Sequence, residues 1–177
     1  MARQPQKPPL VAADTNVLID LADEKETAWD CLETLRGRRN PPRFIVTPTV
    51  IEELAHLMDF GDTEEKCRLA AMALRSLRDW EIEPLNLLPV GHGIVERIGG
   101  ELRAKGLIPE AERHDAFIVA EAALCGADVL VTSDSALTGI DQQCLQIVLA
   151  GFDVKPVVIC WPLRLVKLLG HSSRIAG

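Results

Sequence analysis

Short apolar runs alternate with segments of helical periodicity along the chain. Most of these runs are bounded by polar or turn-forming residues and lack apolar–polar alternation, which is typical of strands buried on both faces of a parallel sheet. We predict strands at residues 10–13, 44–47, 81–87, 128–132 and 157–160. The third contains Pro84, so we expect it to be short or to form an edge of the sheet.

Helical patterns fill the segments between these runs. The clearest covers residues 64–79, where Cys67, Ala70, Leu74 and Leu77 recur at helical spacing with charged residues between them. Further helices are predicted to begin at residues 14 and 48 and to cover residues 27–38, 94–102, 115–124 and 162–169.

Strands that alternate with helices predict an α/β fold, a three-layer α/β/α sandwich with a five-stranded parallel sheet. No internal repeat or linker divides the pattern, so we expect residues 10–169 to form a single domain. Residues 1–9 are polar and rich in proline and are predicted to be a flexible tail, and residues 170–177 a second tail.

Composition narrows the class of protein. The 177 residues carry a net charge of −7, so the total charge does not indicate a strongly cationic nucleic-acid-binding surface. Five cysteines without CxxC spacing predict free thiols in a reducing compartment. No apolar run approaches the roughly 20 residues that span a bilayer. We therefore expect a soluble cytoplasmic protein without membrane association. Glycine-rich nucleotide-binding motifs are absent from the sequence.

Four acidic residues stand where apolar runs end or helices begin. Asp14 and Asp134 follow predicted strands, Asp115 opens a helix, and Glu53 lies at the border of the apolar face of another helix. Ligands of parallel α/β sheets bind outside the carboxyl ends of the strands. Each acid also has a structural explanation, as a helix cap or as a charge that favours a helix N-terminus. Together they predict a site for a hard divalent cation.

Other polar residues near these four leave alternatives open. Asn16 could cap the first helix in place of Asp14. Glu52 lies opposite the apolar face of its helix and is expected to be solvated or to form a capping box with Thr49. Asp141 is a weaker fifth acid whose role stays open. A solvated helix end is expected for Asp20 and the acids after it.

Four segments, taken in order, carry a family resemblance: residues 13–20, 47–54, 114–122 and 126–134. The sequence is similar to the PIN-domain family, which includes many metal-dependent ribonucleases and the toxins of VapBC toxin–antitoxin systems. The resemblance implies a five-stranded parallel sheet between helices. It places Asp14, Glu53, Asp115 and Asp134 on the four acidic positions of the family, and Asn16 and Thr132 on its supporting polar positions.

The resemblance also implies a chemistry and partners. Mg²⁺ or Mn²⁺ would be held by Asp14 and Asp115, with Asp134 and Glu53 binding a second ion or orienting water. RNA would be the substrate, an antitoxin a partner, and a homodimer the assembly. The alternative is a non-catalytic PIN-like module that binds RNA or protein. The basic loop of residues 36–43 is expected to be either a phosphate contact or simply solvated, and Arg164, Lys167 and Arg174 form a weaker phosphate-contact candidate.

Overall fold

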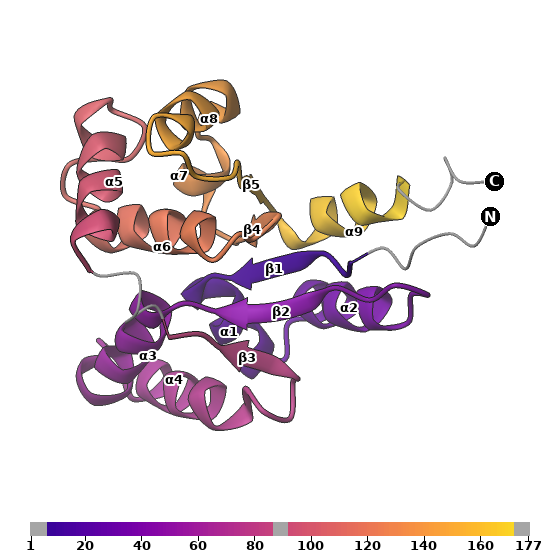
Figure 1. Cartoon of the computed structure of the whole chain (residues 1–177). Helices are drawn as coiled ribbons and strands as arrows, with labels where there is room; N and C mark the ends of the chain where they lie inside the picture. Colours follow the sequence, from indigo (N-terminus) through magenta and orange to yellow (C-terminus); the bar gives the residue numbers. More distant parts are fainter. Residues whose placement is uncertain (1–6, 87–91, 172–177) are drawn as a thin grey trace, which may run out of the picture.

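A five-stranded parallel sheet forms the centre of the protein. The computed structural model describes residues 7–86 and 92–171, with the side chains of residues 92, 170 and 171 excepted. The sheet has the order β3 (Ile82–Pro84), β2 (Arg43–Val46), β1 (Leu10–Ala13), β4 (Val129–Val131) and β5 (Val158–Cys160), and all neighbouring pairs are parallel (Figure 1). The predicted five-stranded parallel α/β fold is confirmed.

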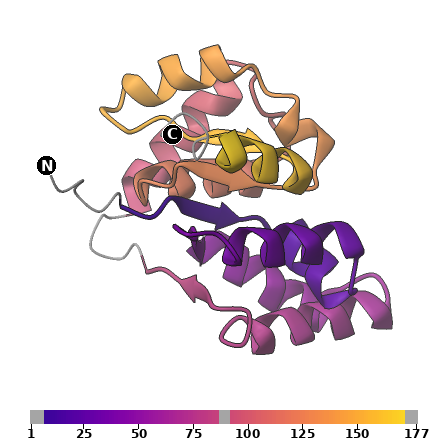
Figure 2. The same cartoon turned by 90° about the vertical axis from the view of Figure 1, so that its right-hand side faces the viewer.

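Helices flank the sheet in two groups. Figure 2 shows helices α1–α4 on one side of β1 and helices α5–α8 on the other. Helix α2 packs against α9, α5 packs against both α6 and α8, and α3 contacts both α4 and α6. The helices of the described residues are α1 (Thr15–Ala22), α2 (Glu26–Arg36), α3 (Pro48–Phe60), α4 (Glu64–Ser76), α5 (His92–Ala104), α6 (Arg113–Leu124), α7 (Ser135–Thr138), α8 (Gln142–Ala150) and α9 (Pro162–His171).

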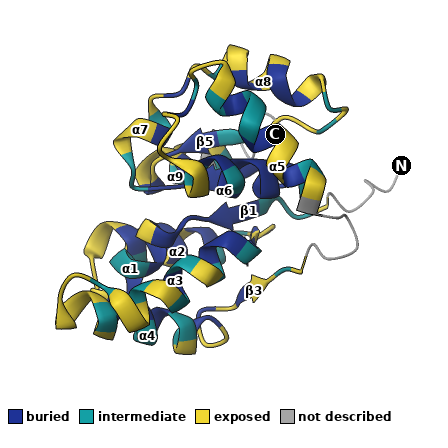
Figure 3. Ribbon diagram, turned by 90° about the vertical axis from the view of Figure 1, so that its left-hand side faces the viewer, coloured by how far each residue is buried: buried dark blue, intermediate teal, exposed yellow. Residues whose placement is uncertain are grey.

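The hydrophobic core lies along the central strands. In β1 and β4 nearly every residue is buried, and Figure 3 shows β1 largely in dark blue. Aliphatic side chains dominate, and Leu18, Ile45, Leu54 and Leu130 are fully buried. Because parallel strands buried on both faces need apolar residues at every position, the continuous apolar runs in the sequence were an accurate signal of these strands.

Both edges of the sheet carry a specific hydrogen-bonding arrangement. At the β3 edge, the N–H of Ile82 donates to the carbonyl of Leu77 at 2.8 Å, and Pro84 has no N–H. At the β5 edge, the N–H of Ile159 donates to the side-chain oxygen of Gln142 at 3.3 Å. The predicted edge position of the strand with Pro84 is confirmed, although that strand is shorter than expected.

Two helices were not predicted from the sequence. Asp134 caps the short helix α7, and Asp141 caps α8 by accepting hydrogen bonds from the N–H groups of Gln143 and Cys144. The buried residues of α8, Leu145, Val148 and Leu149, have helical spacing, so the signal was present in the sequence.

The last helix ends later than predicted. Helix α9 continues through His171, past the predicted end at residue 169. Residues 1–6 and 172–177 of the predicted tails, Leu87 of the predicted third strand and the candidate Arg174 lie outside the described residues. Within the described part of the chain, no helix combines the length and apolar character needed to cross a bilayer.

Candidate acidic site

Asp14 is a buried carboxylate at the end of β1. Its side chain accepts hydrogen bonds from the N–H of Thr15 and the hydroxyl of Thr132, each at 2.7 Å. Its own N–H donates to the carbonyl of Val131 at 3.0 Å. Asp14 therefore caps α1, a role that the sequence had left open for Asn16, and also ties the end of β1 to the end of β4. Asn16 is exposed and makes only a long contact of 3.5 Å with the same carboxylate.

Thr132 links two of the predicted acids. It is fully buried just after β4, and its hydroxyl oxygen accepts a hydrogen bond from the N–H of Asp134 at 2.9 Å while donating to Asp14. The carboxylate of Asp134 caps α7 through the N–H of Ala136 at 2.6 Å. The predicted neighbourhood of Asp14, Thr132 and Asp134 is thus present, and a single hydroxyl sets the spacing of the two acids.

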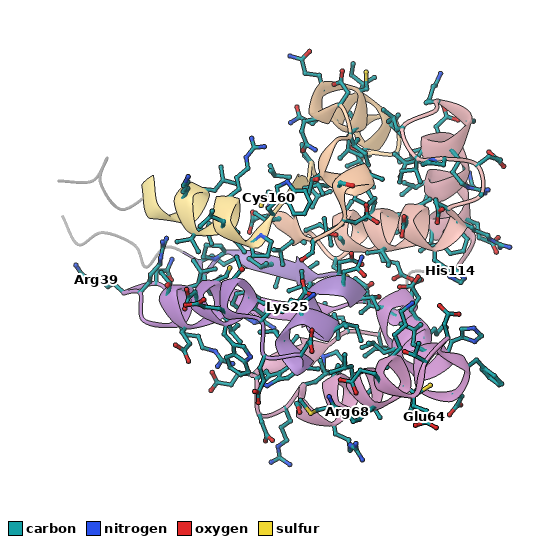
Figure 4. The ribbon with its side chains drawn as sticks, turned by 180° about the vertical axis from the view of Figure 1, so that it is seen from behind. Lys25, Arg39, Glu64, Arg68, His114 and Cys160 are labelled. Atoms are coloured by element: carbon teal, nitrogen blue, oxygen red, sulfur yellow. The ribbon has the colours of Figure 1, made fainter. Side chains whose placement is uncertain are left out.

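Glu53 approaches these acids from helix α3. Its carboxylate accepts a hydrogen bond from the hydroxyl of Thr15, and its other oxygen lies 3.4 Å from Nδ1 of His114. Figure 4 shows His114 at the side of the molecule where α6 and α3 meet. Only 21% of the Glu53 side chain is exposed, whereas Glu52 is exposed. This difference agrees with the expectation that Glu52 is solvated.

Of the two alternatives predicted for Glu52, the solvated one agrees with its exposure, and no capping box with Thr49 forms. Thr49 donates its N–H and its hydroxyl to the carboxylate of Glu121, at 3.0 and 2.8 Å, so the partner of Thr49 comes from helix α6. Glu121 is buried and was assigned no role from the sequence. Its position inside a helix of small residues offered no local signal of this contact.

Asp115 lies half-buried in the first turn of α6. Among the residues that the structure describes, its carboxylate has no hydrogen-bond donor. Burial raises the pKa of Asp115 from 3.8 to about 7, with smaller contributions from the negative charges of Asp14, Asp134, Glu112 and Glu53. An acid held in this environment without a partner favours the binding of a cation.

The pKa of Asp14 is also raised, from 3.8 to about 6. Burial is the largest cause, and the charges of Glu53 and Asp134 add to it, while the hydrogen bonds from Thr132 and Thr15 oppose it. These charge effects mean that the four predicted acids lie within electrostatic reach of one another. Asp14 and Asp134 follow strands, Glu53 lies in the middle of α3, and Asp115 lies at the start of α6.

The chemistry of this donor set suits a hard divalent cation, because all four groups offer carboxylate oxygens. As they stand, no three His, Cys, Asp or Glu side chains within residues 7–86 and 92–171 are arranged to hold an ion. The donor types and the raised pKa values of Asp14 and Asp115 therefore fit a divalent cation, whereas the positions of the side chains do not form a ligand set.

Two further polar residues, Asp20 and Thr47, lie close to the strand ends. Asp20 was expected to be solvated, but its side chain is only 16% exposed and accepts hydrogen bonds from Ser133 at 2.7 Å and Lys25 at 2.5 Å. Thr47 follows β2 beside Asp14 in the strand register, and its buried hydroxyl has no partner in the described structure. Neither the contact of Asp20 nor the burial of Thr47 could be read from sequence spacing, because both depend on how distant segments pack.

Asp141 and the basic loop take no part in this cluster. Asp141 is exposed and caps α8, and hydrogen bonds from backbone N–H groups lower its pKa. The loop of residues 36–43 precedes β2 and therefore lies at the opposite ends of the strands from the acids. Arg36 donates to the carbonyl of Trp80, Arg38 to that of Val166, and Arg43 pairs with Glu83.

Comparisons with known proteins agree with this geometry. The family model described as PIN domain matches residues 11–142, which include all four acids. Two solved structures have a similar fold. VapBC2 from Rickettsia felis, bound to a DNA fragment from its promoter, has a TM-score of 0.57 and 16% identity, covering 86% of this chain and 98% of that one. VapBC-1 from nontypeable Haemophilus influenzae has a TM-score of 0.54 and 16% identity, covering 87% and 98%.

No curated protein sequence matches this chain closely enough to count as a relative. At 16% identity, the two solved structures establish the shared fold alone. The family model covers most of the chain and includes the strand ends and helices that bring the acids together. The chain therefore belongs to the PIN domain family.

Proposed function

We propose that the protein is a metal-dependent endoribonuclease that hydrolyses phosphodiester bonds of RNA at the acidic cluster. One observation carries the proposal: Asp115 is half-buried beside Asp14, Asp134 and Glu53, has no hydrogen-bond donor within the described residues, and has its pKa raised to about 7. A purely structural carboxylate is normally paired when it is buried. An unpaired one among other acids is suited to a cation.

Asp14, Asp115 and Asp134 would hold Mg²⁺ or Mn²⁺, and small movements of these side chains would have to bring them into ligand positions. A bound ion would lower the pKa of a water molecule and stabilise charge on the scissile phosphate. Glu53 would orient or deprotonate that water, because its carboxylate is held near the cluster by Thr15 but lies outside the Asp14–Thr132–Asp134 network.

The surrounding hydroxyl groups would keep the acids in place. Thr132 fixes Asp14 through its hydroxyl and Asp134 through that residue's N–H. Thr15 fixes Glu53 from the first turn of α1. The packed strand ends beneath them exclude water from Asp14, which strengthens its interaction with any bound cation.

A toxin of a toxin–antitoxin pair is the biological role that we favour. The two solved structures of similar fold are VapBC complexes, which supports an antitoxin as the partner of this chain. An antitoxin that covers the acids with a basic side chain would match their charge. We also expect a homodimer and a cytoplasmic location, where the five cysteines, all free in this structure, stay reduced.

Cleavage of end-labelled total RNA by the purified protein tests the proposal. The assay compares Mg²⁺, Mn²⁺ and EDTA, and compares Glu53→Gln with Glu52→Gln, a neighbouring exposed acid on the same helix. Asp115→Asn is included, and each variant is checked for folding by circular dichroism. We expect metal-dependent cleavage that is lost in Glu53→Gln and Asp115→Asn and kept in Glu52→Gln.

Two results would contradict the proposal. Cleavage that survives in folded Asp115→Asn would place the reaction elsewhere. A folded protein free of any partner that cuts no RNA with either metal would favour the non-catalytic binding module.

A further inference from the structure

Trp161 is a large aromatic side chain that remains in contact with water. It is 41% exposed, whereas Trp80 is buried and Trp29 packs edge to face against Trp80 with 6.0 Å between ring centroids. The indole N–H of Trp29 also donates to the carbonyl of Leu21 at 3.0 Å. Among the described residues, the Trp161 ring has neither a ring contact nor a hydrogen bond. A single exposed aromatic residue needs no explanation by itself, so its location is what matters.

Trp161 lies at the edge of the sheet that carries the acids. It directly follows β5, and the carbonyl of Cys160 accepts a hydrogen bond from the N–H of Thr132 at 3.0 Å. The hydroxyl of Thr132 in turn donates to Asp14 at 2.7 Å. Two hydrogen bonds therefore connect the peptide group between Cys160 and Trp161 to the buried acid. Trp161 thus stands at the carboxyl ends of the strands, which form the rim of the acidic cluster.

Cationic side chains share this part of the rim. Arg164 is exposed in the first turn of α9, three residues after Trp161. Lys25 pairs with Asp20, which accepts a hydrogen bond from Ser133, the residue between Thr132 and Asp134. Helices α2 and α9 pack together, and Figure 4 shows Lys25 where α2 begins and Cys160 where α9 begins. The rim thus carries an exposed aromatic residue and two cationic residues in addition to its carboxylates.

This combination matches the chemistry of a single-stranded nucleic acid. A nucleobase of any sequence can stack on an aromatic face, and lysine and arginine attract the phosphates next to it.

We propose that Trp161 is a stacking platform for an unpaired nucleobase of the RNA substrate, with Arg164 and Lys25 facing the sugar–phosphate chain beside it. The inference rests on the proposed ribonuclease function and assigns that site a base-binding subsite.

Binding of a short, unstructured, fluorescently labelled RNA tests this subsite independently of cleavage. The measurements use anisotropy in the Asp115→Asn background with Mg²⁺ present. Trp161→Ala is expected to bind about 10-fold to 100-fold more weakly, and Trp161→Phe to retain most of the affinity, because phenylalanine still stacks. Phe60→Ala is the matched control: Phe60 is 71% exposed at the far end of α3, and its loss should leave affinity unchanged. In the cleaving protein, Trp161→Ala should raise KM more than it lowers kcat.

The outcomes separate the two proposals. Equal RNA affinity of Trp161→Ala and the parent would overturn the stacking platform, even if the acids prove catalytic. A parent that binds no RNA would overturn it as well. RNA that is bound through Trp161 but never cut would support the platform and overturn the ribonuclease. Unchanged RNA affinity together with lost binding of a protein partner would identify this rim as a protein interface and contradict the platform.

Discussion

The carboxylate of Glu121 on α6 accepts hydrogen bonds from both the N–H and the hydroxyl of Thr49 on α3, 72 residues earlier in the chain. Thr47, the N-cap residue of α3, makes no side-chain cap of its own, so an acid from another helix satisfies this helix end. Thr49 and Glu53 are one turn apart on α3, and Asp115 lies on the same helix as Glu121. This contact therefore holds together the two helices that carry two of the four acids.

Removal of the Glu121 carboxylate should destabilise the protein and displace Glu53. Glu121→Ala leaves two buried donors of Thr49 without an acceptor, which costs about 1–3 kcal/mol in the free energy of unfolding. Glu121→Gln keeps one acceptor oxygen and should lose less. Urea unfolding measures the stability, and the cleavage assay measures the activity of the folded fraction. If Glu121→Ala unfolds at the same urea concentration as the parent, the contact contributes nothing to the packing of α3 on α6.

The metal-free protein should lose stability as the pH rises from 4 to 8. The pKa values of Asp14 and Asp115 are raised from 3.8 to about 6 and about 7 in the folded state. The folded state therefore binds more protons than the unfolded state in this range, and deprotonation opposes folding. The loss should be about 1–3 kcal/mol in total, because Asp115 is only half-buried and its share is reduced by solvent.

Two measurements check the origin of this pH dependence. Thermal unfolding in EDTA should show a higher Tm for Asp115→Asn than for the parent at pH 8, and a difference that disappears near pH 4. Saturating Mg²⁺ should raise the Tm of the parent at pH 8 and change that of Asp115→Asn less, since a bound cation stabilises the ionised acids. A parent protein whose stability increases over this pH range would contradict the raised pKa values of Asp14 and Asp115.

The hydroxyl of Thr132 should matter more than its volume. Thr132→Val has nearly the same shape but removes the donor to Asp14 and the acceptor of the Asp134 N–H. We expect a loss of stability of about 1–3 kcal/mol, about 10-fold or more weaker Mn²⁺ binding, and recovery of both in Thr132→Ser. Thr34→Val, an exposed position on α2, serves as the control for the change of residue type. Normal Mn²⁺ affinity in Thr132→Val would show that the hydroxyl does not position the acids.

Two adjacent glycines of α5 should respond in opposite directions to alanine. A Cβ on Gly99 would lie 2.8 Å from Cδ1 of Phe117, the residue two positions after Asp115, whereas a Cβ on Gly100 meets nothing within 4 Å. Gly99→Ala should destabilise by about 1–3 kcal/mol through overpacking. Gly100→Ala should stabilise by about 0.5–1 kcal/mol because alanine favours a helix. Equal Tm changes for the two variants would mean that α5 and α6 can separate at little cost.

Local sequence patterns predicted the positions of some site residues, but they did not predict the contacts between segments far apart in the chain. Asp14 and Asp134 could be placed because each directly follows a continuous apolar strand, and parallel strands must bring such residues to one edge. Glu121 and Asp20 could not be placed, since their partners are 72 and 113 residues away and only tertiary packing selects them. The helix α8 was missed for a different reason: its capping residue, Asp141, was considered as a ligand and not as a helix start.

The two edges of the sheet determine how this protein can associate with others. A strand that adds to a sheet needs free N–H donors along the edge, and Ile82 and Pro84 offer none on β3, while Gln142 occupies the N–H of Ile159 on β5. Extension of the sheet by another chain is therefore blocked at both ends, which protects the protein from edge-to-edge aggregation. Any partner must instead recognise helices and loops, so a complex can form and dissociate without rebuilding the sheet.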